Sequence, residues 1–254
     1  VIAGNILLNC AAVIQKGDLL ALIPKTFLPN YSEFYEKRWF ASSQDLNPID
    51  ILYAGSSIHI TNQPTIFRTY TGATFGIELC EDVWAPEPPS TRLCLSGADI
   101  IFNLSASDEL IGKHNYLCSL LSQQSARTMS GYVYSSSGFG ESTQDLVYGG
   151  NALIYENGNE VASSERFSFE SQMVVAQIDY EMLRAERRNN TTFINAQRPT
   201  SLSHTLPQVR FINCHSTQIR DFVLERYVNP TPFIPASADM KESCEEIFNI
   251  QVAG

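Results

Sequence analysis

The fold of this chain is decided by Gly76-Ile77-Glu78-Leu79-Cys80-Glu81-Asp82-Val83-Trp84. A short apolar run stops at a cysteine, two acidic residues and an aromatic residue follow, and prolines come soon afterwards. This pattern predicts a β-strand that ends in a tight turn, with a helix beginning shortly after it. Such a turn lifts one side chain out of the sheet and directs the next backbone N–H groups toward whatever that side chain attacks. Cys80 is therefore a candidate nucleophile, and the alternative reading is a buried structural cysteine at a strand end.

Strands and helices alternate on both sides of this stretch. Apolar patterning predicts strands over residues 1–8, 11–15, 19–23, 49–60, 65–70, 73–79, 99–104, 132–136, 147–155, 160–163 and 173–178. Helical spacing predicts helices over residues 90–96, 114–130, 180–188 and 218–227, with Gly131 as the stop of the second. Asn157-Gly158 supplies the positive φ angles of a hairpin turn. The alternation indicates a layered α/β domain with a mixed sheet.

Composition limits the classes of protein to which the chain belongs. A net charge of −10 over 254 residues argues against a nucleic-acid partner, because phosphate binding needs clustered Lys and Arg. No apolar run approaches the roughly 20 residues of a membrane span. The six cysteines are scattered and form no metal-ligand spacing with the four histidines, so we expect no metal site and a reducing, cytoplasmic location.

Lys25 is the second candidate for chemistry. It follows the apolar run 19–23 and Pro24, and precedes a loop that is rich in aromatic residues. A fixed ammonium, together with a backbone N–H, stabilises the oxyanion that forms when a thiolate attacks a carbonyl. A surface lysine on a loop is the simpler interpretation of the residue taken alone.

Three stretches together carry a resemblance to a known family: residues 24–31 (PKTFLPNY), residues 34–40 (FYEKRWF) and residues 76–84. They closely resemble the nitrilase superfamily of carbon–nitrogen hydrolases, and within it the glutaminase domain of glutamine-dependent NAD synthetases. The resemblance runs from residue 1 to about residue 188 and implies an α-β-β-α sandwich. Residues 189–235 are expected to be an irregular excursion and linker, and residues 236–254 resemble the start of a synthetase domain. Both ends look interrupted, so the sequence is interpreted as an N-terminally truncated fragment.

The resemblance also implies a site. Cys80 matches the nucleophile, and Lys25 matches the catalytic lysine, which acts with the backbone N–H of Glu81. Glu36 is the better match, over Glu33, for a second glutamate that orients the lysine. The family's general-base glutamate lies upstream of the segment that matches Val1, and residues 1–24 contain no Glu. The residues that match glutamine-binding positions are Tyr31, Glu81, Trp84, Ser107 and Lys113.

The activity implied by the resemblance is hydrolysis of L-glutamine, with the ammonia passed to a synthetase domain of the same protein. ATP and Mg²⁺ are expected only in that domain, no cofactor is expected in this chain, and the family implies a homo-oligomer. Two alternatives remain open from the sequence. One is a stand-alone nitrilase-type amidase, and the other is an inactive structural or interaction module that lacks its base.

Overall fold

The computed structural model describes residues 1–198, 208–215, 222–234 and 240–254. The chain divides into two compact units, Val1–Asp221 and Phe222–Gly254. The second unit contains helix α5 (Met240–Ala253), on which the described residues include none that is buried. None of the described helices is long and apolar enough to cross a membrane.

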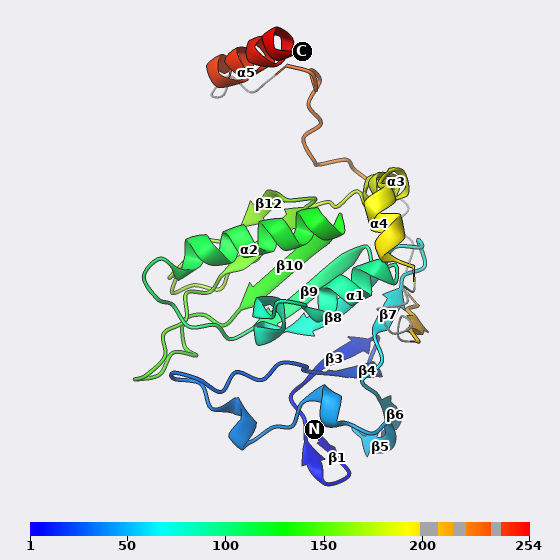
Figure 1. Ribbon diagram of the computed structural model, residues 1–254. Helices are drawn as coiled ribbons and strands as arrows, with labels where there is room; N and C mark the ends of the chain where they lie inside the picture. Colours follow the sequence, from blue (N-terminus) through cyan, green and yellow to red (C-terminus); the bar gives the residue numbers. More distant parts are fainter. Residues whose placement is uncertain (199–207, 216–221, 235–239) are drawn as a thin grey trace. The chain divides into compact units, whose positions relative to one another are not determined.

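A seven-stranded mixed sheet forms the centre of the first unit, with the strand order β12-β11-β10-β9-β8-β7-β13 (Figure 1). The strands are β7 (Thr65–Arg68), β8 (Thr74–Leu79), β9 (Ile100–Ser105), β10 (Gly131–Ser136), β11 (Ala152–Glu156), β12 (Asn159–Ser163) and β13 (Arg210–Asn213). The central strands β8, β9 and β10 run parallel, while β7 and β11 are antiparallel to their inner neighbours. The carboxyl ends of the three parallel strands therefore meet at one edge, which is where α/β sheets bind ligands.

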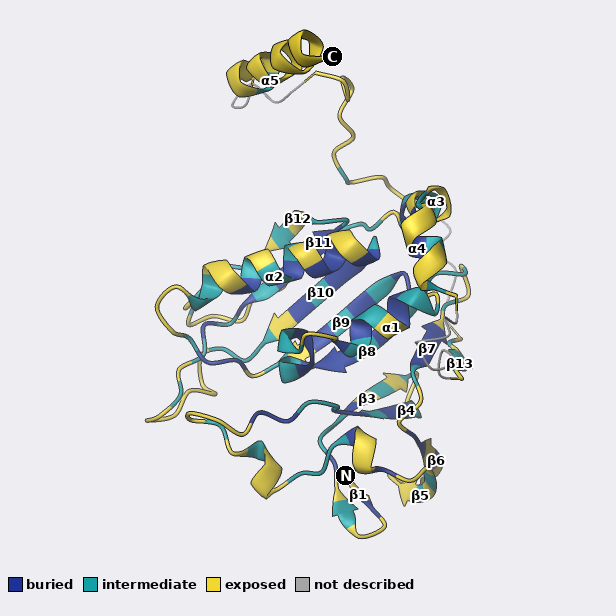
Figure 2. Ribbon diagram, in the orientation of Figure 1, coloured by how far each residue is buried: buried dark blue, intermediate teal, exposed yellow. Residues whose placement is uncertain are grey.

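Helices α1 (Pro89–Leu95) and α2 (Lys113–Thr128) lie side by side on one face of this sheet (Figure 1). Pro89 occupies the first turn of α1, where its missing N–H costs no hydrogen bond. The main core lies between these helices and the sheet and includes Leu93, Ile101, Leu117, Leu121 and Tyr132. Figure 2 shows α2 with its outer surface exposed, lying over the sheet beside the largely buried strand β10.

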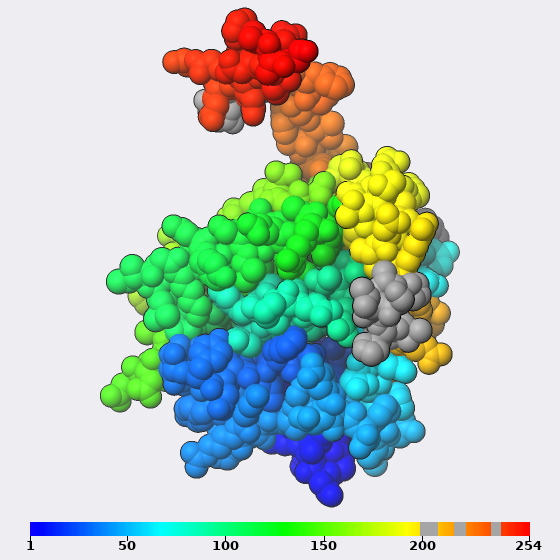
Figure 3. Space-filling model, in the orientation of Figure 1, coloured from blue at the N-terminus to red at the C-terminus, as the bar shows by residue number. Residues whose placement is uncertain are grey.

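The N-terminal part folds into three hairpins. They are β1 (Ile2–Ala3) with β2 (Ile6–Leu7), β3 (Cys10–Gln15) with β4 (Asp18–Pro24), and β5 (Ile49–Tyr53) with β6 (Ser56–Ile60). They share a second core that includes Leu8, Leu22, Leu46 and Ile60. In the space-filling view these segments, in blue, pack directly against the part that carries α1 and α2, in green (Figure 3).

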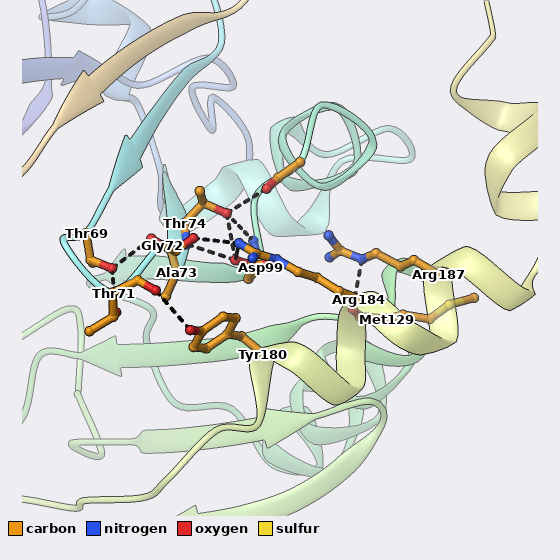
Figure 4. Close-up of polar contacts among 11 residues, drawn as sticks. Thr69, Thr71, Gly72, Ala73, Thr74, Asp99, Met129, Tyr180, Arg184 and Arg187 are labelled. Carbon is orange, nitrogen blue, oxygen red and sulfur yellow. Dashed lines mark hydrogen bonds and ion pairs between the residues drawn. The ribbon is translucent and has the colours of Figure 1, made fainter. Parts of the chain in front are cut away.

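Helix α3 (Tyr180–Asn189) is fixed to the sheet by polar contacts (Figure 4). The Arg184 guanidinium donates to both oxygens of the buried Asp99 carboxylate, at 2.9 and 2.6 Å. Tyr180 donates to the carbonyl of Thr71 in the turn between β7 and β8. Arg187 Nε donates to the carbonyls of Thr128 and Met129 at the end of α2. These contacts hold together elements that are 50 to 110 residues apart in the chain.

Several sequence predictions need correction. The expected strand over residues 1–8 is instead the β1–β2 hairpin, because the chain turns at Gly4 with a φ of +60°. Residues 173–178 form no strand, and residues 189–215 are not wholly irregular, because they contain α4 (Thr191–Ala196) and β13. The expected helix over residues 218–227 lies partly outside the described residues, and residues 222–227 are not helical.

Candidate active site

Cys80 lies where β8 ends and a short 3-10 helix, η3 (Cys80–Trp84), begins. Its φ angle is +44°, in the left-handed region that residues other than glycine rarely adopt. Strained backbone of this kind persists only where the surrounding structure holds it, and it is concentrated at functional sites. The Cys80 side chain is half-buried, and its Sγ lies 3.9 Å from the carbonyl oxygen of Ala106. The tight turn predicted from the sequence is therefore present.

Cys80 and Lys25 line the same cavity, which has a volume of about 620 Å³. Lys25 enters it just after the end of β4, and residues at the carboxyl ends of β8, β9 and β10 line it as well. The other lining residues include Asn9, Phe34, Glu36, Ser105, Ala106, Ser136, Leu146 and Tyr148. The fold thus brings together the two candidate catalytic residues, although 55 positions separate them in the chain.

The Lys25 ammonium is buried and paired. Its Nζ lies 2.5 Å from Glu36 Oε2, and Asn9 Nδ2 donates to Glu36 Oε1 at 2.7 Å. A buried charge without a partner is costly, so Glu36 offsets the cost of burying the Lys25 side chain and fixes its direction. Glu36 lies where the resemblance expects a lysine-orienting glutamate. No sequence pattern indicated that Asn9, the second partner of Glu36, belongs to the site.

A second group of contacts lies beside Cys80. Tyr31 Oη donates to Glu81 Oε1 at 2.7 Å, and the Tyr31 ring packs edge-on against Phe34 with centroids 6.0 Å apart. Glu81 follows Cys80 directly in the chain, and its carboxylate is held by the Tyr31 hydroxyl. A carboxylate placed in this way is able to bind an ammonium group.

Lys113 is at the start of α2, over two aromatic rings. Its Nζ lies 5.6 Å from the centre of the Trp84 ring and 6.0 Å from that of Phe34. The carboxylate of Asp108, which is buried, is 2.5 Å from the same Nζ. The contact to Phe34 connects Lys113 with the Tyr31–Glu81 pair, so these residues form one continuous group. The sequence reasoning missed Asp108 and Phe34.

Ser107 is buried and lies one residue beyond Ala106, whose carbonyl faces Cys80. Its backbone N–H donates to Ser136 Oγ at 3.3 Å. The loop that carries Ser107 is also fixed through Glu109, which accepts hydrogen bonds from Asn151 at 2.7 Å and Arg166 at 2.6 Å. Glu109 comes from a loop and its partners from distant segments, so no sequence motif indicated this contact.

No group of three His, Cys, Asp or Glu side chains that could hold a metal ion occurs within the described ranges. The acidic residues around the site instead bind backbone N–H groups, hydroxyl groups or cations. Asp82 is one of them, since its carboxylate accepts hydrogen bonds from the backbones of Thr26, Phe27 and Leu79. A thiol and a fixed ammonium thus line one cavity, an arrangement that suits addition to a carbonyl carbon.

No protein-family model matches the chain. The glutamine-dependent NAD(+) synthetase of Mycobacterium tuberculosis (strain ATCC 25618 / H37Rv) is 36% identical over 249 residues, which cover 97% of this chain and 36% of that protein. The enzyme of the same name from Mycobacterium leprae (strain TN) is 34% identical over 260 residues, again 97% of this chain and 36% of the relative. The chain therefore spans little more than a third of the length of these relatives.

The comparison with solved structures agrees. A glutamine-dependent NAD(+) synthetase from Cytophaga hutchinsonii superposes with a TM-score of 0.57 at 26% identity, covering 66% of this chain and 27% of that chain. A carbon–nitrogen hydrolase from Helicobacter pylori G27 has a TM-score of 0.60, and its 19% identity supports the fold alone; it covers 77% of this chain and 64% of that chain. The nitrilase-like α/β fold expected from the sequence is thereby confirmed. With its α/β fold of the nitrilase superfamily, the chain belongs to the family of glutamine-dependent NAD(+) synthetases.

Proposed function

We propose that this chain is the glutaminase part of a glutamine-dependent NAD(+) synthetase, with Cys80 as its nucleophile and Lys25 as its oxyanion-stabilising cation. The observation that carries this proposal is that Cys80 and the Lys25–Glu36 pair share one cavity. The Lys25 side chain is buried and held by Glu36 in that cavity instead of reaching solvent. A cysteine with only a structural role would not require a buried ammonium in the same cavity. The alternative of an inactive structural or interaction module is therefore the weaker one.

The chemistry follows from the two side chains. The Cys80 thiolate adds to the side-chain amide carbon of L-glutamine, and the resulting oxyanion accepts hydrogen bonds from Lys25 Nζ and the Glu81 N–H. The C–N bond then breaks as the nitrogen takes up a proton, and ammonia leaves. Water adds to the γ-glutamyl thioester on Cys80, the C–S bond breaks, and glutamate is released.

Glu36 is not assigned as the general base, because both of its oxygens are engaged by Lys25 and Asn9. The family resemblance assigns the base to a glutamate upstream of the segment that matches Val1. In the same proposal, Glu81 binds the α-ammonium of glutamine, Ser107 and Lys113 bind its α-carboxylate, and Tyr31 and Trp84 form the walls. Charge-assisted bonds of this kind are the strong ones in amino-acid recognition.

The ammonia is proposed to pass to a synthetase domain of the full protein, where ATP and Mg²⁺ activate nicotinic acid adenine dinucleotide for amidation to NAD. A homo-oligomer in the cytoplasm is the expected setting. The link to NAD synthesis is supported by the name of the relatives. ATP, Mg²⁺, the homo-oligomer and the cytoplasmic setting are what the family resemblance implies.

The test is covalent labelling, which does not depend on turnover. The chain is treated with a diazoketone analogue of glutamine, and the adduct is located by peptide mass spectrometry. We expect one adduct, on Cys80, which L-glutamine prevents and which is absent from Cys80→Ala. The matched control is Cys118→Ala, because Cys118 is half-buried on α2, outside the cavity, and this variant should label as the wild type does.

Two results would count against the proposal. Equal labelling of several cysteines, with no protection by glutamine, would favour the interaction-module alternative. Protection by simple amides such as propionamide, as strong as that by glutamine, would favour a stand-alone amidase. Asparagine should give no protection, because its shorter side chain cannot place both the head group and the amide.

A further inference from the structure

The carboxylate of Asp82 binds the two segments that carry the proposed catalytic residues. Its Oδ1 accepts hydrogen bonds from Thr26 N at 3.1 Å and Phe27 N at 2.7 Å, and its Oδ2 accepts one from Leu79 N at 2.9 Å. Asp82 is 1% exposed. Thr26 directly follows Lys25, and Leu79 directly precedes Cys80. One buried side chain therefore connects the backbone beside each of them.

The backbone N–H and C=O groups of Lys25 itself bind segments outside the central sheet. Its N–H donates to the carbonyl of Asn9 at 2.8 Å, and its carbonyl accepts from Ser43 N at 2.9 Å. These two bonds fix Lys25 relative to the N-terminal hairpins and to the 3-10 helix η2 (Ser43–Asp45). Neither of them reaches the turn at Cys80, which belongs to the central sheet. The bonds of Asp82 do reach it, from the lysine segment to the cysteine segment.

The same carboxylate also closes the turn at Cys80. By accepting from Leu79 N, Asp82 satisfies a backbone donor at the start of η3, in the manner of a helix cap. Cys80 lies inside this closed turn with its unfavourable φ of +44°. Residues in such a conformation persist only where neighbouring contacts hold them, and the Asp82–Leu79 bond is one such contact.

We propose that Asp82 is a positioning residue, whose carboxylate sets the distance between Lys25 and Cys80 so that one oxyanion meets both the ammonium and the Glu81 N–H. This inference rests on the proposed function, since it concerns the same reaction. Misplacement of a catalytic group by about 1 Å is enough to cost on the order of 100-fold in rate. Asp82 acts through the backbone and touches no reacting atom.

Both carboxylate oxygens of Asp82 are needed to accept the three backbone hydrogen bonds. A variant with a single acceptor oxygen therefore tests the proposal. The side chain of Asp82→Asn has one acceptor oxygen and one NH₂ group, so at least one of the three backbone donors loses its acceptor. The matched control is Asp99→Asn. Asp99 is also 1% exposed and accepts from a backbone N–H, that of Thr74 at 2.8 Å, but it lies at the other end of β8 and β9. It binds Arg184 and contacts neither catalytic segment.

The first measurement is the saturation kinetics of labelling by the diazoketone analogue, corrected for the folded fraction. For Asp82→Asn we expect the maximal labelling rate to fall by at least about tenfold, while the half-saturating concentration changes by less than about twofold, because head-group binding is retained. Asp99→Asn should keep the maximal rate per folded molecule. A purely structural role of Asp82 would lower the folded fraction in both variants and leave that rate unchanged.

The second measurement is amide hydrogen exchange, which does not depend on the reaction. At least one of the three amides that Asp82 binds, those of Thr26, Phe27 and Leu79, should exchange at least about tenfold faster in Asp82→Asn than in the wild type, with Ala21 and Leu22 of β4 unchanged. If Asp82→Asn does not fold, Asp82→Glu takes its place. That variant keeps the charge but moves the carboxylate by one methylene, so its maximal labelling rate should also fall.

The outcomes separate the two proposals. If the wild type shows no glutamine-protected label on Cys80, the proposed function is overturned, and the role of Asp82 in the reaction falls with it. If the wild type labels as expected, a wild-type maximal rate in Asp82→Asn overturns only the positioning role, as does unchanged exchange at all three amides, those of Thr26, Phe27 and Leu79. Slow labelling, normal half-saturation and fast exchange at one or more of these three amides together support it.

Discussion

Lys25 and Glu36 form the most tightly enclosed ion pair of the site. Their side chains are 4% and 15% exposed, and Asn9 occupies the second oxygen of the carboxylate. Removing one member of such a pair leaves a charge in a place from which water is largely excluded. The pair at Arg92 and Glu87 has side chains that are 53% and 63% exposed, so its charges remain hydrated with or without each other.

Glu36→Gln should therefore lower the free energy of unfolding by roughly 1–3 kcal/mol, because a buried cation loses its counter-charge. Glu87→Gln should change it by less than about 1 kcal/mol, as is usual for exposed pairs. Urea unfolding of both variants at pH 7 measures the difference. A loss of equal size in the two variants would show that the burial of Lys25 does not depend on Glu36.

Lys113 offers a test of head-group recognition. Lys113→Met keeps a side chain of similar length over the Trp84 and Phe34 rings but removes the charge that we assign to the α-carboxylate of glutamine. We expect the glutamine concentration that half-protects Cys80 to rise by roughly tenfold, in line with about 1.5–3 kcal/mol for a hydrogen bond to a charged group. Lys37→Met, at an exposed position, is the control. Identical protection in both variants would place the carboxylate elsewhere.

Sequence motifs identified those site residues whose chemistry is visible in their type and spacing. Cys80 could be identified because an apolar strand ends at it, and Lys25 because a loop with a family pattern follows it. Asn9 and Asp82 could not, because their importance comes from partners 27 and 56 positions away in the chain. Such contacts exist only once the hairpins are packed against the sheet, and no local pattern encodes them.

At the scale of elements, the turn between β11 and β12 is determined both by its own residues and by its packing against α2. Asn157 and Gly158 have φ angles of +47° and +89°, as the Asn-Gly pair predicted. The turn also packs on α2, where Ser122 Oγ donates to the Gly158 carbonyl at 2.6 Å. A Cβ atom at Gly158 would lie 2.9 Å from Cβ of Ala126. Gly158 is therefore required both by the backbone and by the close approach of the helix.

Gly158→Ala should accordingly destabilise the chain more than Gly55→Ala does. Gly55 has a φ of +79° in the β5–β6 turn, with no atom within 4 Å of an added Cβ, so only its backbone is strained. The strain alone costs about 1–2 kcal/mol, and the clash with α2 adds to this at Gly158. Thermal and urea unfolding of the two variants measure the difference. Equal losses would mean that α2 yields to the added methyl group at no cost.

The end of α2 shows why some boundaries could not be predicted. Gly131 was expected to stop this helix, yet the helix ends at Thr128, and Met129 takes the left-handed conformation with a φ of +46°. The carbonyls of Thr128 and Met129 at this end accept hydrogen bonds from Arg187 of α3. The cap thus comes from a helix almost 60 positions further along the chain, while Gly131 begins β10.

At the scale of the whole molecule, two buried carboxylates connect the central sheet to the surrounding layers. Asp82 binds the lysine segment, and Glu78 accepts from Ser90 N at 2.7 Å, at the start of α1, and from the Tyr132 hydroxyl in β10. Burial raises the pKa of Glu78 to about 7 and that of Asp82 to about 6, although hydrogen-bond donors oppose both shifts. The ordinary values are 4.5 and 3.8, so both groups take up protons more readily in the folded state.

The sign of the resulting pH dependence follows from this difference. Between pH ~4 and ~7 the folded chain holds more protons than the unfolded chain, so the free energy of unfolding should fall as the pH rises. Each group contributes up to about 1.4 kcal/mol per unit of pKa shift. We expect urea unfolding at pH 5, 6, 7 and 8 to show this decline, and Glu78→Gln to flatten it, because the amide does not ionise. Glu87→Gln, at an exposed position, should keep the wild-type slope. Stability that rises with pH over this range, or an unchanged slope in Glu78→Gln, would mean that these carboxylates are already ionised at pH 5 and are stabilised by their donors.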